Sequence, residues 1–294
     1  MTVRIAVLGT GNMGSAIAER LANTGFTIFL WNRTIDKAKS LASKINATVY
    51  ETPWRAIENA DVAITLVSDD NALYDIISQM RRSDGLLFIN SSTITPKASM
   101  VASKQLKELG ACYVEAPIIG NPHDLIQGNV IFLVAGERNC VRYSMGILMS
   151  AGKIIEIEGE SYKASIAKLI YNSMLISSIQ LLSESLTLAD AYGISQEKVK
   201  EIMENTIFKQ FVGKYLDRII NENHPTSFKI SLAAKDLEYA NSAAFDANLV
   251  LPLIRTSAQT FKQADIFGLN ESDYTKIFNF INPKKFKKIS NSNK

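Results

Sequence analysis

The chain has 294 residues, of which 47% are hydrophobic, so it can bury one large core or two ordinary ones and does not have the composition of a disordered protein. Its formal net charge is only +3, and five of its lysines fall within residues 284–294. The rest of the chain carries 27 basic and 29 acidic residues, a balance that excludes a nucleic-acid-binding body by charge. We expect the basic end to be solvated rather than a binding arm.

A glycine turn follows the first apolar segment of the chain. Residues 3–8 (VRIAVL) are typical of a buried parallel strand, residues 15–23 of a helix, and GTGNMG lies between them. In such a turn the first glycine permits the bend, the second lets a pyrophosphate approach the backbone, and the third lets the helix pack on the strand. A second strand at 27–31 completes the unit. The sequence therefore predicts a dinucleotide site that includes Gly9, Gly11, Asn12, Met13 and Gly14.

The end of the second strand predicts which dinucleotide binds. NAD sites usually have Asp or Glu here to hold the ribose 2′-hydroxyl, whereas this strand ends in WNRT and a lysine follows one helical turn later. The guanidinium of Arg33 can stack on adenine and hold a 2′-phosphate, and Thr34 can donate its hydroxyl. We therefore predict NADP(H) in preference to NAD(H), bound at this end by Asn32, Arg33, Thr34 and Lys37.

Two halves with different patterns follow one another along the chain. Strands and helices alternate up to about residue 160, which is typical of a doubly wound α/β sheet. Further strands are expected at 47–50, 62–67, 86–90, 111–115, 130–135 and 153–158, and helices at 35–45, 72–80 and 96–109. A long helix at about 164–192 is then followed by helices at 196–205, 211–221, 232–247 and 251–267. We predict a Rossmann-type domain at 1–162, an all-helical domain at 163–283 joined by the long helix, and a basic tail at 284–294.

Cysteine and histidine usage predicts no metal site. Cys112 and Cys140 lack metal-ligand spacing, and we expect both to be reduced thiols of a cytoplasmic protein. The fold begins at about residue 3, which leaves no room for a signal peptide. The longest uncharged run, residues 169–183, is too short and too rich in serine to span a bilayer. We therefore expect a cytoplasmic protein without a membrane partner.

The long helix carries a candidate proton donor. Lys168 and Asn172 are four residues apart, so they share one helix face, which continues with Leu175 and Ile179. A nicotinamide enzyme needs a group that supplies or removes the proton at the reacting oxygen, and a partly buried lysine can do both. From this spacing alone, a lysine whose amine reaches solvent, beside a satisfied asparagine, is an equal alternative.

The chain resembles the β-hydroxyacid dehydrogenases, which include 3-hydroxyisobutyrate dehydrogenase and glyoxylate/succinic semialdehyde reductase, up to about residue 282. The motifs that carry the resemblance are LGTGNMG at the start, SSTITP at 91–96, AK with Asn172 at 167–172, and AKDL with a later alanine at 234–240. The resemblance implies that Lys168 is the catalytic acid and base with Asn172 beside it. It also implies hydride exchange with a small hydroxy acid or aldehyde acid, and a homodimer or homotetramer. The cofactor contacts that it adds are Leu66, Val67, Asn71, Thr93 and Lys235.

The expected substrate turn departs from the family. The family holds the substrate carboxylate with a Ser-Gly-Gly turn after an acid-x-Pro segment, whereas this chain has EAPIIGN at 115–121. We expect Ile119, Gly120 and Asn121 to bind the substrate in a more apolar and more crowded pocket with one hydroxyl fewer. Val67 also stands where the family usually has proline.

Two alternatives remain open. Imine reductases share the fold and a WNRT-type signature, and their corresponding turn is apolar and ends in proline, as Ile118, Ile119 and Pro122 partly do. They usually have Asp or Tyr where this chain has Lys168, which favours carbonyl over C=N reduction. The second alternative, a non-catalytic cofactor-binding scaffold, is disfavoured by the intact glycine turn and the retained lysine.

Overall fold

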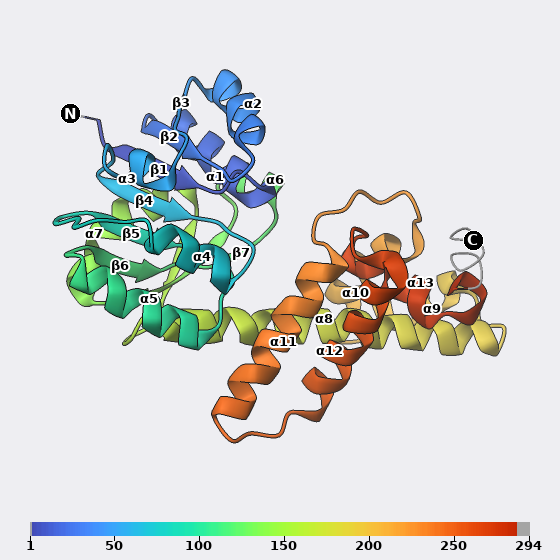
Figure 1. The fold of residues 1–294 in the computed structure, drawn as a ribbon. Helices are drawn as coiled ribbons and strands as arrows, with labels where there is room; N and C mark the ends of the chain where they lie inside the picture. The colour runs from blue at the N-terminus through green and yellow to red at the C-terminus, as the bar shows by residue number, and fades with distance from the viewer. Residues whose placement is uncertain (1, 287–294) are drawn as a thin grey trace. The chain divides into compact units, whose positions relative to one another are not determined.

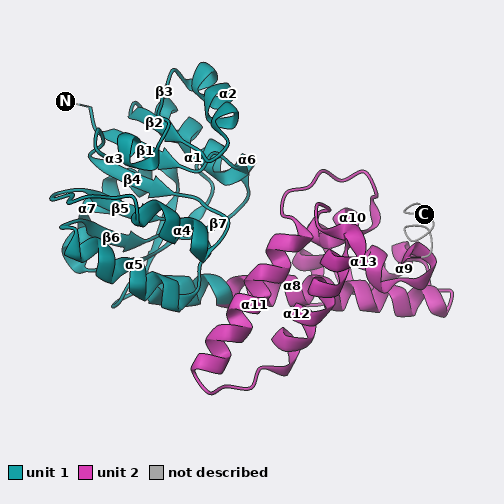
Figure 2. Ribbon diagram, in the orientation of Figure 1, with its two compact units in different colours: residues 1–169 teal, residues 170–294 magenta. Residues whose placement is uncertain are grey.

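The chain divides into two compact units. The computed structural model describes residues 2–286, and unit 1 covers residues 1–169 and unit 2 residues 170–294 (Figure 2). Unit 1 is a sheet with helices on it, and the described part of unit 2 is helical (Figure 1). The predicted fold class, a Rossmann-type sheet domain followed by a helical domain, is confirmed. Most of the predicted basic tail, from residue 287 onward, lies outside the described residues.

Unit 1 is built on a nine-stranded sheet in the order β3-β2-β1-β4-β5-β6-β8-β7, with β9 paired to β8. The first six strands pair in parallel, β8 runs antiparallel to β6 and β7, and β9 is parallel to β8. The strands are β1 (Arg4–Leu8), β2 (Thr27–Trp31), β3 (Thr48–Val49), β4 (Val62–Thr65), β5 (Leu87–Asn90), β6 (Cys112–Glu115), β7 (Ile118–Ile119), β8 (Ile131–Gly136) and β9 (Lys153–Glu156). The order reverses between β1 and β4, and ligands of doubly wound sheets bind outside the carboxyl ends of the strands at such a point.

Helices cover both faces of this sheet, which explains why its strands are almost continuously apolar. Successive side chains point to opposite faces. Val7 and Ile64 pack in one core with α1, α2, α6 and α7, whereas Ala63 and Phe88 pack in another with α3, α4 and α5. These helices are α1 (Asn12–Asn23), α2 (Ile35–Ile45), α3 (Pro53–Ile57), α4 (Asp70–Ile77), α5 (Pro96–Glu108), α6 (Pro122–Ile126) and α7 (Arg138–Ala151).

Unit 2 has a core of its own. The long helix α8 (Tyr162–Ala191) begins in unit 1 and continues in unit 2, close to the predicted bounds. The helices that follow are α9 (Gln196–Glu204), α10 (Lys209–Ile220), α11 (Ile230–Asp246), α12 (Pro252–Ala264) and α13 (Ile277–Ile281), with short π and 3₁₀ segments at Asp265–Leu269 and Tyr274–Lys276. Phe261 and Phe278 are completely buried or nearly so in this core. No helix within the described part of the chain has both the length and the apolar character that crossing a membrane requires.

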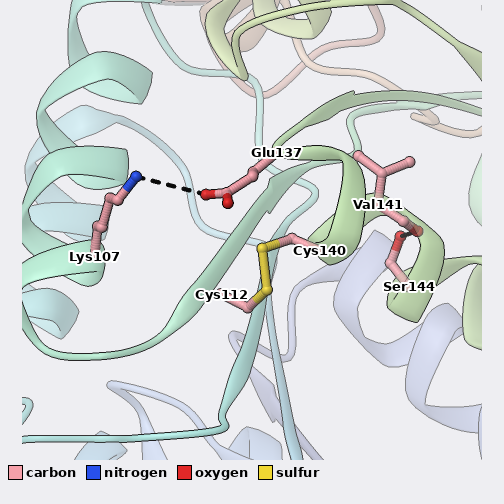
Figure 3. Close-up of a disulfide and its surroundings, with 6 residues drawn as sticks. All are labelled: Lys107, Cys112, Glu137, Cys140, Val141 and Ser144. Atoms are coloured by element: carbon pink, nitrogen blue, oxygen red, sulfur yellow. Dashed lines mark hydrogen bonds and ion pairs between the residues drawn. A yellow bond between two sulfur atoms is a disulfide. The ribbon is translucent and has the colours of Figure 1, made fainter.

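The expectation of two reduced thiols is wrong. Cys112 at the start of β6 and Cys140 in the first turn of α7 form a disulfide with Cα atoms 5.4 Å apart (Figure 3). The helix packs on the sheet beside β6 and brings together two residues that are 28 positions apart, and a sequence separation of this size does not predict pairing. An ion pair between Lys107 and Glu137, with 3.6 Å between Nζ and Oε2, lies close by.

Candidate functional site

The glycine turn between β1 and α1 leaves no room for side chains at two of its positions. Gly9 has a φ of +103°, and a Cβ there would lie 2.3 Å from the carbonyl oxygen of Leu66. A Cβ on Gly14 would lie 1.9 Å from the carbonyl oxygen of Gly9. The first glycine therefore makes the turn and the third allows the helix to approach it, as the motif predicts.

The middle of the turn is open and fits a phosphate. No heavy atom of the described chain lies within 4 Å of a Cβ built on Gly11 beyond its own neighbours, and Gly11 is the N-cap of α1. No side chain of the described residues caps this helix, so the amides of Asn12 and Met13 belong to a first turn with free N–H groups and the positive end of the helix dipole. Such an end is a ready site for the pyrophosphate of a dinucleotide.

The end of β2 is tied to the glycine turn and presents basic side chains to solvent. Asn32 Oδ1 accepts a hydrogen bond from Thr10 N at 2.9 Å, and Asn32 Nδ2 donates to Thr34 O at 2.9 Å. Arg33, Thr34 and Lys37 are exposed. Asn32 thus organises the loop, and the exposed guanidinium and ammonium groups are free to meet a phosphate.

Two further loops lie at the carboxyl edge of the same strands. Leu66 and Val67 follow β4 and are half-buried, and Asn71 is exposed in the first turn of α4. Thr93 is half-buried in the segment between β5 and α5. Val67 N donates to Ser92 Oγ at 2.9 Å, which joins the two loops. Because β2, β1, β4 and β5 are neighbours in this order, the fold brings the predicted cofactor contacts of unit 1 to one edge of the sheet.

The predicted proton donor lies against the predicted substrate turn. Lys168 is buried, and its Nζ donates to the carbonyl oxygen of Ile118 at 2.7 Å. Ile118 and Ile119 form the short strand β7, which pairs with β8. Gly120 comes next with a φ of +146°, and a Cβ there would lie 2.5 Å from Val130 Cγ1. The structure therefore places the lysine amine beside the turn at 119–121.

The side chain of Asn121 is engaged within its own turn. Its Oδ1 accepts from Asp124 N at 3.0 Å and its Nδ2 donates to Asp124 Oδ2 at 2.6 Å, which caps α6. A carboxylate at this turn would therefore meet backbone N–H groups rather than the carboxamide. Asn121 followed by Pro122 is a pattern typical of a helix start, with asparagine as the N-cap and proline in the first helical position.

Unit 2 contains a second polar cluster, and one of its members was not predicted. Asn172 Nδ2 on α8 donates to Asp236 Oδ2 on α11 at 2.5 Å, and Lys235 Nζ lies 3.0 Å from Asp236 Oδ1. The same ammonium lies 4.6 Å from the ring centre of Tyr239. Asp236 is 2% exposed, so it is a buried carboxylate that orients both the predicted Asn172 and the predicted Lys235. Its place next to Lys235 in the AKDL motif was the available signal.

Glu115 is a second buried acid that sequence reasoning did not assign to the site. It is completely buried at the end of β6 and accepts hydrogen bonds from the Tyr113 hydroxyl and from Asn90 Nδ2. Burial raises the pKa of Glu115 to about 7, while the hydrogen bonds from Tyr113 and Asn90, together with those of Ser99 and Ser165, act in the opposite direction. The carboxyl thus titrates in the neutral range.

Two family models match consecutive parts of the chain. Residues 4–160 match the NAD binding domain of 6-phosphogluconate dehydrogenase, and residues 163–281 match the NAD-binding domain of NADP-dependent 3-hydroxyisobutyrate dehydrogenase. The chain belongs to the β-hydroxyacid dehydrogenase family. Membership supports binding of a nicotinamide cofactor and oxidoreductase chemistry on a small molecule, while the preferred cofactor and the substrate belong to the proposal below.

Curated relatives of this family match over almost the whole chain. An uncharacterized oxidoreductase of Bacillus subtilis, YfjR, is 29% identical over 290 residues, which cover 95% of this chain and 100% of the relative. The chloroplastic glyoxylate/succinic semialdehyde reductase 2 of Arabidopsis thaliana is 26% identical over 282 residues, which cover 94% of this chain and 78% of the relative.

Solved structures of this fold include two kinds of enzyme. A 3-hydroxyisobutyrate dehydrogenase of Mycobacterium tuberculosis with L-serine has a TM-score of 0.85 at 21% identity, covering 96% of this chain and 99% of its own. A reductive aminase of Aspergillus terreus in complex with NADPH and ethyl levulinate has a TM-score of 0.66 at 19% identity, and the match covers 95% of this chain and 99% of the aminase chain. At these identities the likeness is one of fold.

Proposed function

We propose that the protein is an NADPH-dependent reductase and dehydrogenase that exchanges hydride with a small aldehyde acid, keto acid or β-hydroxy acid, with Lys168 as general acid and base. The observation that carries the proposal is the buried Lys168 amine, 2.7 Å from the carbonyl oxygen of Ile118 and beside the turn at 119–121. An ammonium group has three N–H bonds, and this contact uses one of them.

The proposed cofactor site uses residues that the fold gathers at one edge of unit 1. The open turn at Gly11 and the free amides of Asn12 and Met13 favour the pyrophosphate. Arg33 and Lys37, both exposed at the end of β2, favour a 2′-phosphate. Further contacts in unit 1 are proposed for Gly9, Gly14, Asn32, Thr34, Leu66, Val67, Asn71 and Thr93. The family resemblance adds Lys235, a residue of unit 2.

The chemistry divides between cofactor and chain. When bound, the reduced nicotinamide supplies the hydride to the substrate carbon. Lys168 Nζ donates its proton to the carbonyl oxygen and stabilises the negative charge that develops there, and in the reverse direction it accepts the hydroxyl proton. The hydrogen bond from Asn172 to Asp236 fixes the carboxamide one helical turn from the lysine, ready to bind the same oxygen.

The proposed substrate site is a backbone site with an apolar neighbour. The N–H groups of Gly120 and Asn121 bind the substrate carboxylate, while Ile119 supplies apolar surface where a serine would supply a hydroxyl. Because the Asn121 carboxamide is held by Asp124, it orients the turn rather than the substrate. This arrangement favours substrates with a carbon chain next to the carboxylate.

A substrate panel separates this function from the imine reductase alternative, which the apolar turn and the shared fold of the reductive aminase favour. NADPH oxidation is measured with short aldehyde acids, keto acids and cyclic imines, and NADP⁺ reduction with β-hydroxy acids. Turnover of the oxo acids supports the proposal, and turnover of cyclic imines alone replaces it with C=N reduction. Tight NADPH binding without turnover on any of them supports the scaffold alternative.

We also propose that the protein is a homodimer or homotetramer. Large apolar side chains are exposed around the connection between α11 and α12, with Phe245 at 82%, Val250 at 84% and Leu253 at 79%. Exposed apolar patches on this scale are typical of association surfaces. Light scattering of the purified protein tests this, because a monomer at all concentrations contradicts it.

A further inference from the structure

Three buried polar residues stand in register at the ends of neighbouring strands. Thr65 ends β4, Asn90 ends β5 and Glu115 ends β6, they pair across the sheet in this order, and none is exposed to solvent. A buried carboxyl costs free energy even when hydrogen-bonded, and apolar residues of similar volume are often as stable or more so. The stability of the core therefore does not explain why polar residues occupy these three positions.

Asn90 is the centre of the row. Its Nδ2 donates to both carboxyl oxygens of Glu115 at 3.1 Å. Its Oδ1 accepts from the Thr65 hydroxyl at 2.8 Å and from Ser92 N at 3.2 Å. Because the carboxyl oxygens of Glu115 accept from the carboxamide nitrogen and the Thr65 hydroxyl donates to the carboxamide oxygen, the two neighbours fix which way the carboxamide faces.

Through Ser92, Asn90 is hydrogen-bonded to the loop after β4 and to the segment between β5 and α5. Ser92 Oγ accepts from Val67 N at 2.9 Å and donates to Thr65 O at 3.3 Å, so Ser92 links the loop after β4 to the segment that contains Thr93. The other end of that segment is held by Asp70, whose carboxylate accepts from Thr95 N at 3.0 Å and Thr95 Oγ1 at 2.6 Å. Thr93 thus lies between two anchored points, one of which depends on the polar row.

We propose that Glu115 is a positioning residue that acts through Asn90 to hold Ser92 in place. Ser92 in turn holds the Val67 amide and the Thr93 backbone in the arrangement that receives the nicotinamide end of the cofactor. The proposal rests on the proposed function, which assigns Val67 and Thr93 to the cofactor. The adenosine end at Arg33 follows β2 and has no bond to the row among the described residues.

Three variants separate positioning from packing. Glu115→Met fills the volume but removes the acceptor for Asn90, whereas Glu115→Gln keeps one oxygen for it. Tyr113→Phe is the matched control, because it removes a different hydrogen bond to the same carboxyl and keeps both carboxyl oxygens as acceptors for Asn90. Should Glu115→Met fail to fold, Thr65→Val removes the hydroxyl that holds the opposite end of Asn90.

The first measurement uses the protein without cofactor. Amide hydrogen exchange is followed at Val67 and at Ser92, the two donors that the row fixes. We expect exchange at least roughly 10-fold faster in Glu115→Met and in Thr65→Val, and wild-type rates in Glu115→Gln and Tyr113→Phe, since local opening sets the exchange rate. Unchanged protection in Glu115→Met and in Thr65→Val overturns the proposal, and so does equal loosening in Tyr113→Phe.

The second measurement compares two ligands. NADPH carries the nicotinamide, whereas 2′,5′-ADP reports only on the adenosine end. We expect Glu115→Met to weaken NADPH about 10-fold or more and to leave 2′,5′-ADP unchanged, with Glu115→Gln close to wild type, because a small misplacement of the receiving loop is enough to lose this much. Equal weakening of both ligands overturns the proposal. Failure of the cofactor assignment on which the proposal rests looks different: wild-type protein then binds no NADPH, whatever the exchange rates show.

Discussion

Replacing Glu115 by glutamine should change the pH dependence of stability. Glu115 is completely buried, and burial raises its pKa from 4.5 to about 7. The folded protein therefore holds the proton over a range in which the unfolded chain has lost it. The stabilising contribution of the protonated carboxyl is complete below the unfolded pKa of 4.5 and is lost as pH rises through the folded pKa of about 7. Glutamine stays neutral and loses nothing over this range.

The size of the effect follows from the two pKa values. Between about pH 5 and about pH 8, a carboxyl with these values lowers the free energy of unfolding by about 2.5 kcal/mol. We therefore expect the free energy of unfolding of Glu115→Gln, relative to wild type, to rise by about that amount across the interval. Both proteins are unfolded in urea at each pH, with tryptophan fluorescence as the signal, because both tryptophans, Trp31 and Trp54, lie in unit 1.

Glu108→Gln is the matched control, because Glu108 is exposed near the end of α5 in the same unit. Its difference from wild type should stay flat across the same pH interval. The prediction fails if the difference in the free energy of unfolding between Glu115→Gln and wild type stays equally flat or grows towards acid pH. Burial would then not drive this carboxyl towards its neutral form.

Three further outcomes test other parts of the site and the fold. Arg33→Ala should raise the KM for NADPH roughly 10- to 100-fold and leave that for NADH nearly unchanged, the scale of a lost charge-assisted hydrogen bond; equal effects in steady-state assays would remove the 2′-phosphate assignment. Ile119→Ser should raise kcat/KM for small β-hydroxy acids about 5- to 10-fold by one hydrogen bond, and unchanged kinetics would mean that this turn does not set specificity. Lys276→Met should lower the free energy of unfolding of unit 2 by about 2 kcal/mol. The buried ammonium of Lys276 donates to Arg218 O at 2.7 Å and to Asn221 O at 2.6 Å at the end of α10, and the variant loses both hydrogen bonds. An unchanged urea midpoint, measured by circular dichroism, would contradict this prediction.

Much of the fold could be predicted because the local signals agree with the global structure. The strand, glycine turn and helix at the start are a single local unit, and each glycine has its steric reason within it. The helix α2 (Ile35–Ile45) has the predicted bounds, since its apolar stripe is visible in the sequence. The structure adds that Asn46, with a φ of +52°, ends the helix in the left-handed conformation. The long helix α8 follows from the change of pattern in the same way.

Other features depend on partners that are distant in sequence. β7 has two residues, and the pairing of Ile118 and Ile119 with β8 exists only once the sheet has formed. The disulfide depends on how α7 packs beside β6. α7 was not among the predicted helices, although its buried residues, which include Cys140, Ser144 and Ile147, are spaced as on one face of a helix.

The candidate site likewise contains residues that the sequence could identify and contacts that it could not. Lys168 could be selected from its spacing and the family resemblance, but its contact with Ile118 could not. Asp236 and Glu115 were visible as residues of known motifs, yet their importance comes from burial and from the amides that they hold. Buried acids of this kind are identified by their hydrogen-bond partners, and a single sequence does not show these.

The most direct test of the account is the rate of hydride transfer in a single turnover of Lys168→Ala. The matched control is Lys163→Ala, which removes an exposed lysine from the first turn of the same helix. With an oxo acid that the wild type reduces, the loss of NADPH absorbance in Lys168→Ala should slow roughly 10²- to 10⁴-fold, the scale for loss of a general acid, with NADPH affinity nearly unchanged. The control should keep the wild-type rate. A Lys168→Ala rate equal to wild type would contradict the claim that this amine transfers the proton.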